Sequence, residues 1–331
     1  MSAILHPFAV LFRFHKMKML GALLIALFFV IVLFPKQDLS DYVAALVTQK
    51  TETYVRFDDL GFTLMPGLGI SASEVLIEPR GLPPVKASLI EAAPAFLKLL
   101  TAKAGATVHA QDLFKGDVTV NYAQGSGTMH EIAVDADQVN LNELADFLRA
   151  AGISSLNLQG NLGLDAFINV DQTFKQQPSG NVSINIPAFV FPGQEVQMNM
   201  NGVFLPVALP TLNLGKVAMN VKLADRQLEI VNLDIGNAAT DLSGKVKGNI
   251  GMNLQPTPVG VQPQVSKIEM RVDVLINKDF ATRTPLLSSM LALINDPGCK
   301  QATDKGTRIA CVITMVPGSQ FPTYRALTEK L

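Results

Sequence analysis

The sequence predicts a mainly β protein of the α+β class: an N-terminal transmembrane helix, then a curved antiparallel β-sheet with a few short helices. The sheet is expected to be either an open groove or a closed roll. Two observations carry this prediction. A long apolar run lies near the N-terminus. From residue 156 to 276, apolar and polar residues alternate with a period of two, which is typical of strands that are wet on one side. Helices do not alternate with these strands, so antiparallel pairing is favoured.

The apolar run Met19–Phe34 contains sixteen uncharged residues. A helix of this length covers roughly 24 Å, close to the ~30 Å thickness of a hydrocarbon core. The basic residues before the run predict that the first residues stay in the cytoplasm and that the rest of the chain crosses the membrane; they are Arg13, Lys16 and Lys18. A cleaved signal peptide is the alternative, but no small-residue cleavage motif follows the run. We expect an uncleaved, single-pass anchor over residues 19–35.

Two helices are predicted in the first half of the translocated chain. Apolar residues at helical spacing, such as Leu39, Tyr42 and Leu46, predict an amphipathic helix over residues 38–50. Between them, residues 54–79 are typical of strands that break at a Pro-Gly pair. The next predicted helix, residues 94–104, starts with a proline suited to a first helical turn and ends before a glycine. Residues 116–122 alternate and predict a further strand.

Two more helices are predicted later in the chain. Asn140 is suited to cap a helix over residues 140–151, and Gly152 is suited to end it. The alternating strands of residues 156–276 follow. A last helix is predicted over residues 285–295, with Thr284 as its cap. The predicted organisation is thus a cytoplasmic N-terminus (1–18), the anchor (19–35), an α+β half (36–150) and a β-rich half with the C-terminal helix and a cysteine loop (151–331).

Cys299 and Cys311 are the only two cysteines in the sequence, and both lie on the translocated side of the predicted topology. A close pair in an oxidising compartment usually forms a disulfide, here around a polar loop of about a dozen residues. Two free buried thiols and a metal site are the alternatives, although two ligands without a nearby histidine are too few for a structural metal.

The composition and motifs point away from catalysis and nucleic-acid binding. Charged residues make up 17% of the chain, the net charge is −1 and there is no Trp, so neither basic patches nor stacking platforms are expected. Of the four histidines, only His109 and His130 lie beyond the anchor, and neither accompanies a nucleophile motif. We therefore expect no enzyme activity, no catalytic residues, no cofactor and no metal.

Several segments resemble a known family. They are "VRFDDLGFTLMPGLGISASEVLIE" (55–78), "LKLLTAKAGATVHAQDLFKGDVTV" (97–120), "VDADQVNLNELADFLRAAGISSLNLQGNLGLD" (134–165) and "LPTLNLGKVAMNVKLADRQLEIVNLDIGNAATDLSGKVKGNI" (209–250). Together with the N-terminal anchor, they resemble the type II secretion system protein N (GspN) family, which is itself similar to AsmA-like periplasmic proteins. The likeness covers roughly residues 36–255, and the cysteine loop lies outside it.

The resemblance implies a protein of the bacterial inner membrane, N-terminus inside, with most of the chain in the periplasm. It implies a non-enzymatic component of the type II secretion system that binds other secretion-system or envelope proteins. The alternative is an AsmA-like protein that binds phospholipid or transfers it between membranes. In that case the apolar side of the sheet would form a groove for acyl chains, whereas in a closed roll it would be ordinary core. The groove-lining candidates are Leu158, Leu164, Val221, Ile230, Ile250 and Met270.

Overall fold

The computed structural model describes residues 36–51, 53–63, 69–94, 104–152, 156–200, 203–257, 260–284, 287, 291, 294, 296–316, 322–329 and 331. The predicted cytoplasmic segment and the predicted anchor, residues 1–18 and 19–35, lie outside this part of the chain. Among the described residues, no helix is both long enough and apolar enough to cross a membrane.

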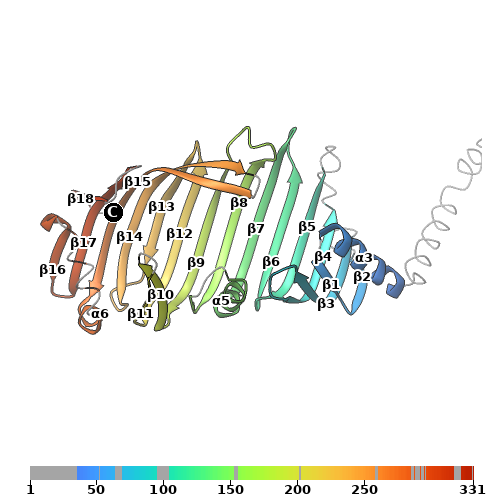
Figure 1. The fold of residues 1–331 in the computed structure, drawn as a ribbon, viewed down its shortest axis with the longest axis horizontal. Helices are drawn as coiled ribbons and strands as arrows, with labels where there is room; N and C mark the ends of the chain where they lie inside the picture. Colours follow the sequence, from blue (N-terminus) through green and yellow to red (C-terminus); the bar gives the residue numbers. More distant parts are fainter. Residues whose placement is uncertain are drawn as a thin grey trace, which may run out of the picture.

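One 16-stranded antiparallel sheet forms most of the protein and curves along its length (Figure 1). This confirms the prediction of a mainly β protein with a curved antiparallel sheet and few helices. The strands of the first half are β1 (Thr53–Arg56), β2 (Asp59–Thr63), β3 (Gly69–Pro79), β4 (Val85–Pro94), β5 (Gly105–Leu113), β6 (Gly116–Gln124) and β7 (Met129–Asn140). Those of the second half are β8 (Asn161–Asp171), β9 (Ser179–Phe191), β12 (Leu212–Ala224), β13 (Gln227–Ile235), β14 (Leu242–Thr257), β15 (Gly260–Asn277), β16 (Lys300–Thr303), β17 (Gly306–Met315) and β18 (Thr323–Ala326).

The order of strands in the sheet follows the chain almost without exception: β1-β3-β4-β5-β6-β7-β8-β9-β12-β13-β14-β15-β17-β16. Strand β2 also pairs with β3, and β18 also pairs with β17. The hairpin of β10 (Gln194–Met200) and β11 (Val203–Leu209) forms a separate two-stranded sheet between β9 and β12 in the chain. The end strands β1 and β16 are not paired with each other, so strand pairing leaves the large sheet open.

The helices lie at the ends and along one edge of the sheet (Figure 1). Those whose bounds fall within the described part of the chain are α3 (Lys36–Thr51), α5 (Leu141–Ala150), α6 (Lys278–Arg283) and the short 3-10 helix η1 (Pro297–Cys299). Helices α3 and α5 confirm that 38–50 and 140–151 are helical, but Tyr42 and Leu46, predicted for the apolar side of the first helix, are exposed. The Asn140 side chain caps α5 by accepting hydrogen bonds from two backbone N–H groups, and Gly152 follows the helix with a φ of 70°.

The predicted helix over residues 94–104 needs correction. Pro94, predicted to open a helix, is the last residue of β4, and Gly105, predicted to stop that helix, is the first residue of β5; residues 95–103 between them lie outside the described part. Helix α6 was not predicted. It begins because Asn277 accepts a hydrogen bond from the backbone N–H of Asp279, and Thr284, predicted as a cap for the next helix, follows its end. Leu287 and Leu291 are helical, in agreement with the helix predicted over 285–295, and most of that range lies outside the described part.

The sheet curves because its strand pairing is interrupted. Register shifts occur between Ala136 and Val139 in β7, between Ile230 and Leu233 in β13, and between Ile250 and Met252 in β14. An extra residue in one strand of a pair bends that strand and increases its twist.

The most deeply buried apolar cluster lies at the C-terminal end of the sheet. Its members are Ile276, Phe280, Cys299, Ile309 and Cys311. Partly buried side chains of the segment after α6, including Leu287, Leu291 and Ile294, pack against this cluster. The predicted boundary between the two halves, at 150/151, falls after α5, and β7 on one side of it pairs with β8 on the other.

Candidate functional site

One face of the sheet is apolar from end to end. Residues that pair directly across antiparallel strands carry their side chains on the same face, so the pairings trace one row of residues across thirteen strands, with one residue from each. In order from β3 to β18, this row is Ile70, Ala92, Val108, Val120, Val134, Ala166, Val182, Val221, Ile230, Gly248, Met270, Ile313 and Tyr324. We call the side of the sheet that carries this row the apolar face.

The opposite side is polar in the same continuous way. The neighbouring row on that side runs from β3 to β13 and consists of Ser71, Glu91, His109, Thr119, Asp135, Asp165, Ser183, Asn220 and Asn232. We call this side the polar face. Such a contrast is typical of an antiparallel sheet with one side in water and the other side covered by apolar material.

The structure brings five of the six groove-lining candidates together on the apolar face. Val221, Ile230 and Met270 belong to the row above, Leu164 pairs with Ala136 and Ile184, and Ile250 pairs with Leu228 and Ile268. The sixth, Leu158, does not lie in a strand. The strand predicted from residue 156 begins at Asn161 instead, because Gly160 adopts a positive φ of 138° and Gln159 makes only an isolated bridge to Val190.

The side chains of the apolar face are half-buried, not buried. Leu164, Val221, Ile230, Ile250 and Met270 all fall in this intermediate range of exposure. The described helices make their main contacts elsewhere: α3 packs on β1 and β2, α5 on β7, and α6 on β15 and β17. The middle of the face is therefore a broad apolar surface that, within the described part of the chain, the helices leave uncovered.

Large apolar side chains are most exposed toward the N-terminal end of the apolar face. Phe62, Ile70, Val108 and Tyr122 are each 36–40% exposed. An apolar hollow of about 510 Å³ lies there, lined by Phe62, Gly69, Ile70, Ala92, Ala93, Pro94, Gly105 and Ala106. An exposed apolar surface of this extent in a folded protein marks a binding surface.

The C-terminal end of the apolar face is covered. Leu287, Leu291 and Ile294, between α6 and β16, pack against the cluster that contains Ile276, Ile309 and Cys311. The disulfide between Cys299 and Cys311, with 5.0 Å between the two Cα atoms, ties the end of this segment to β17. Both cysteines are fully buried. We call residues 278–299 the C-terminal plug.

The upper edge of the apolar face is crossed by the ends of β14 and β15. Beyond the register shift after Ile250, the two strands continue as a hairpin that runs across the ends of β12 and β9 toward β8 (Figure 1). The backbone N–H of Met252 donates to the carbonyl of Arg226 at 2.8 Å. At the far end, the Leu254 N–H and carbonyl form hydrogen bonds of 2.8 and 3.0 Å with the Gln177 side-chain amide.

Asp171 fixes the loop that receives this hairpin. Its carboxylate accepts hydrogen bonds from the Thr128 hydroxyl at 2.7 Å, the Thr173 N–H at 2.9 Å and the Gln176 N–H at 3.0 Å. These bonds, with that of Thr128 first, hold the pKa of the Asp171 carboxyl well below its usual range. The hairpin thus rests on a loop whose shape depends on one buried ionised group.

This loop is expected to loosen in acid. Because the folded-state pKa of Asp171 is lowered, its stabilising effect is complete above the ordinary carboxyl pKa of about 4 and is lost as the pH falls below it. The protection factors of the Thr173 and Gln176 amides, which correct the exchange rate for its intrinsic pH dependence, should fall as the pH drops below about 4. In Asp171→Ala these protection factors should be low at every pH, whereas Asp165→Ala, on the polar face, should behave like the wild type. Protection factors that stay constant down to about pH 2 in the wild type would contradict this role.

The two histidines beyond the predicted anchor have local structural partners. The Nδ1 atom of His109 lies 2.9 Å from the Thr119 hydroxyl, and that of His130 lies 2.7 Å from the Tyr122 hydroxyl, with the two rings stacked. Groups of three or more side chains that could hold a metal ion do not occur among the described residues.

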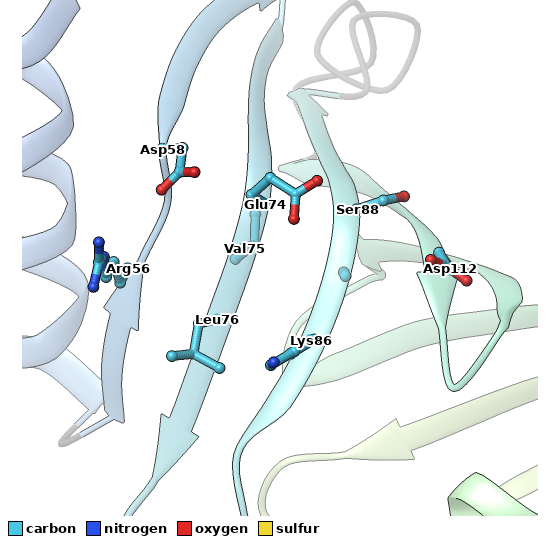
Figure 2. A pocket seen from close by; sticks show the side chains of 9 residues that line it. Arg56, Asp58, Glu74, Val75, Leu76, Lys86, Ser88 and Asp112 are labelled. Atoms are coloured by element: carbon cyan, nitrogen blue, oxygen red, sulfur yellow. The ribbon is translucent and has the colours of Figure 1, made fainter.

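A second hollow, of about 360 Å³, lies at the N-terminal corner of the sheet (Figure 2), and because most of its lining residues are charged we call it the polar hollow. It is lined by Arg56, Asp58, Glu74, Val75, Leu76, Lys86, Ala87, Ser88 and Asp112. Sequence reasoning missed this hollow, because its charged residues are spread over more than fifty positions and only the register of β1, β3 and β4 brings them together.

Comparisons with known proteins add no relative: no family model, no curated protein and no solved structure matches this chain.

Proposed function

We propose that the protein binds the acyl chains of lipids on the apolar face of its sheet and so acts in lipid binding or lipid transfer. The observation that carries this proposal is the unbroken row of apolar residues from Ile70 to Tyr324, on a face whose middle is only half-buried. Acyl chains suit such a surface because they have no polar groups that would need partners there.

The dimensions of the face are suited to lipid. The twelve strands from β3 to β17, at about 4.8 Å per strand, extend over roughly 50 Å. An acyl chain spans one leaflet, which is half of a ~30 Å hydrocarbon core, or about 15 Å. Because the face is longer than this, it has room for more than one acyl chain along its length. About ten buried methylenes contribute roughly 8 kcal/mol, which is the binding free energy of a micromolar complex.

Photo-crosslinking in cells tests the proposal with adjacent residues as a matched pair. A photoreactive phenylalanine analogue at Val221 faces the apolar side, whereas the same analogue at Asn220 faces the polar side. We expect phospholipid adducts, identified by mass spectrometry, at Val221 and at its partner Ile230, and at most about a tenth of that yield at Asn220 and Asn232. Equal yields on both faces, or adducts only with protein at Val221, would rule out lipid binding on this face.

A role as an accessory component of type II secretion remains a prediction from the resemblance, and it is compatible with lipid binding in an anchored periplasmic protein. Its test is genetic. Deletion of the gene should impair export of secreted substrates, and unchanged export would count against this role while leaving the crosslinking test of lipid binding unaffected.

A further inference from the structure

The apolar face changes character at one corner. On β4 the residues of this face run from Ala92 and Ile90 to Ser88 and Lys86. Glu74 of β3 and Asp112 of β5 line the same hollow as Ser88 and Lys86. A polar area therefore lies beside the apolar one at this corner of the sheet.

The polar hollow described above occupies this corner. Arg56, Leu76 and Lys86 pair in one row across β1, β3 and β4. Figure 2 shows the Glu74 carboxylate between β3 and β4 on the side of Ser88, the Lys86 ammonium directed toward Leu76, and Asp112 beyond Ser88. The hollow thus holds two cations and three carboxylates around one hydroxyl.

These charges face the hollow without neutralising each other. The ion pairs among the described residues join other side chains, and all five charged residues of the hollow are exposed. Glu74 has a φ of 49° and Asp112 a φ of 60°, in a region that costs energy for residues with a side chain. Asp112 is followed by a turn, but Glu74 adopts this conformation in the middle of a strand.

From this arrangement we infer that the polar hollow is the headgroup subsite for a zwitterionic phospholipid with a primary ammonium group. Arg56 and Lys86 suit the phosphate, and the carboxylates of Asp58, Glu74 and Asp112 suit an ammonium that can donate hydrogen bonds. The apolar hollow lined by Ile70, Ala92 and their neighbours lies on the same strands, in place for the acyl chains. This inference rests on the proposed lipid binding and adds the class of lipid.

The test compares headgroups captured in cells by the full chain. The photoreactive analogue is placed at Ile90, beside the polar hollow, and in a second protein at Val221, in the middle of the face. Mass spectrometry of the adducts gives the ratio of phosphatidylethanolamine to phosphatidylglycerol. We expect this ratio to be higher at Ile90 than in the whole membrane, and to fall about tenfold in Glu74→Gln/Asp112→Asn, which removes two of the carboxylates that suit the ammonium and so the charge-assisted hydrogen bonds they would accept.

A matched control removes two carboxylates from the polar face. Asp135 and Asp165 pair directly with each other there, so Asp135→Asn/Asp165→Asn should leave the ratio at Ile90 unchanged. Lipid adducts at Val221 should persist in every variant. If lipid is captured at both positions but the ratio at Ile90 equals that of the membrane, or does not respond to Glu74→Gln/Asp112→Asn, the headgroup subsite is wrong while lipid binding stands. If neither position captures lipid, the proposed function itself fails. A phosphomonoester without acyl chains in the Ile90 adduct would also overturn the subsite.

Discussion

Replacing Ile250 with glutamate is expected to empty the sheet of lipid without unfolding it. Ile250 lies on the apolar face between Leu228 and Ile268 and is half-buried. In the empty sheet the new carboxylate keeps its water, but bound acyl chains would strip that water away, at a cost of several kcal/mol. Lipid binding should therefore weaken by about a hundredfold or more. The measurement is the amount of phospholipid that copurifies with fragment 36–331 from cells, together with its melting temperature.

The control for this variant is Asn181→Glu on the polar face, where position 181 pairs with Phe167 and Lys222. It adds the same charge without placing it opposite another carboxylate, and it should retain both its lipid and its melting temperature. If the wild-type fragment carries no lipid and Ile250→Glu unfolds, the apolar face is an ordinary packed core, and the proposed function is wrong.

Removal of the disulfide is expected to release the C-terminal plug. Cys299 and Cys311 are twelve positions apart and fully buried, and a crosslink that closes a loop of this size stabilises a protein by about 3 kcal/mol in the chain-entropy model. Cys299→Ser/Cys311→Ser should lower the melting temperature by roughly 5–10 °C. Limited proteolysis should then cut within residues 278–299 before it cuts the strands of the sheet.

Reduction provides the control for this second prediction. Dithiothreitol should shift the wild-type melting temperature to that of the double serine variant, and it should not shift the variant itself. If the variant melts like the oxidised wild type and resists proteolysis, apolar packing around Phe280 holds the plug without help from the disulfide.

Local patterns in the sequence were sufficient to predict the faces of the sheet. Alternation alone assigned Leu164, Val221, Ile230, Ile250 and Met270 to one side, because a strand has a fixed period of two and each strand can be read separately. The helix α5 was equally local, since its cap and its terminal glycine are both adjacent to it in sequence. Such features need no knowledge of what a segment pairs with.

Features that depend on pairing or on unusual turns were not predictable. The turns Phe114–Lys115 and Asp225–Arg226 have positive φ at both residues. Asn-Gly or Asp-Gly is the usual sequence signal for this conformation, so the sequences of these two turns do not predict it. Whether the sheet closes depends on how its first and last strands meet, and the polar hollow depends on the register that places Arg56 beside Leu76 and Lys86. Alternation contains no information on either.

The strand order has a consequence for how the protein forms. Nearly every strand pairs only with the strand made just before it and the strand made just after it, so most contacts close short loops, which is the condition for fast, stepwise folding. Each new hairpin can dock on the edge left by the previous one, as in a repeat protein that grows by nearest-neighbour addition. Gain or loss of one hairpin would change the length of the sheet by about 10 Å and leave every other side chain on its original face. Length is therefore a property that this architecture can vary in evolution without a new fold.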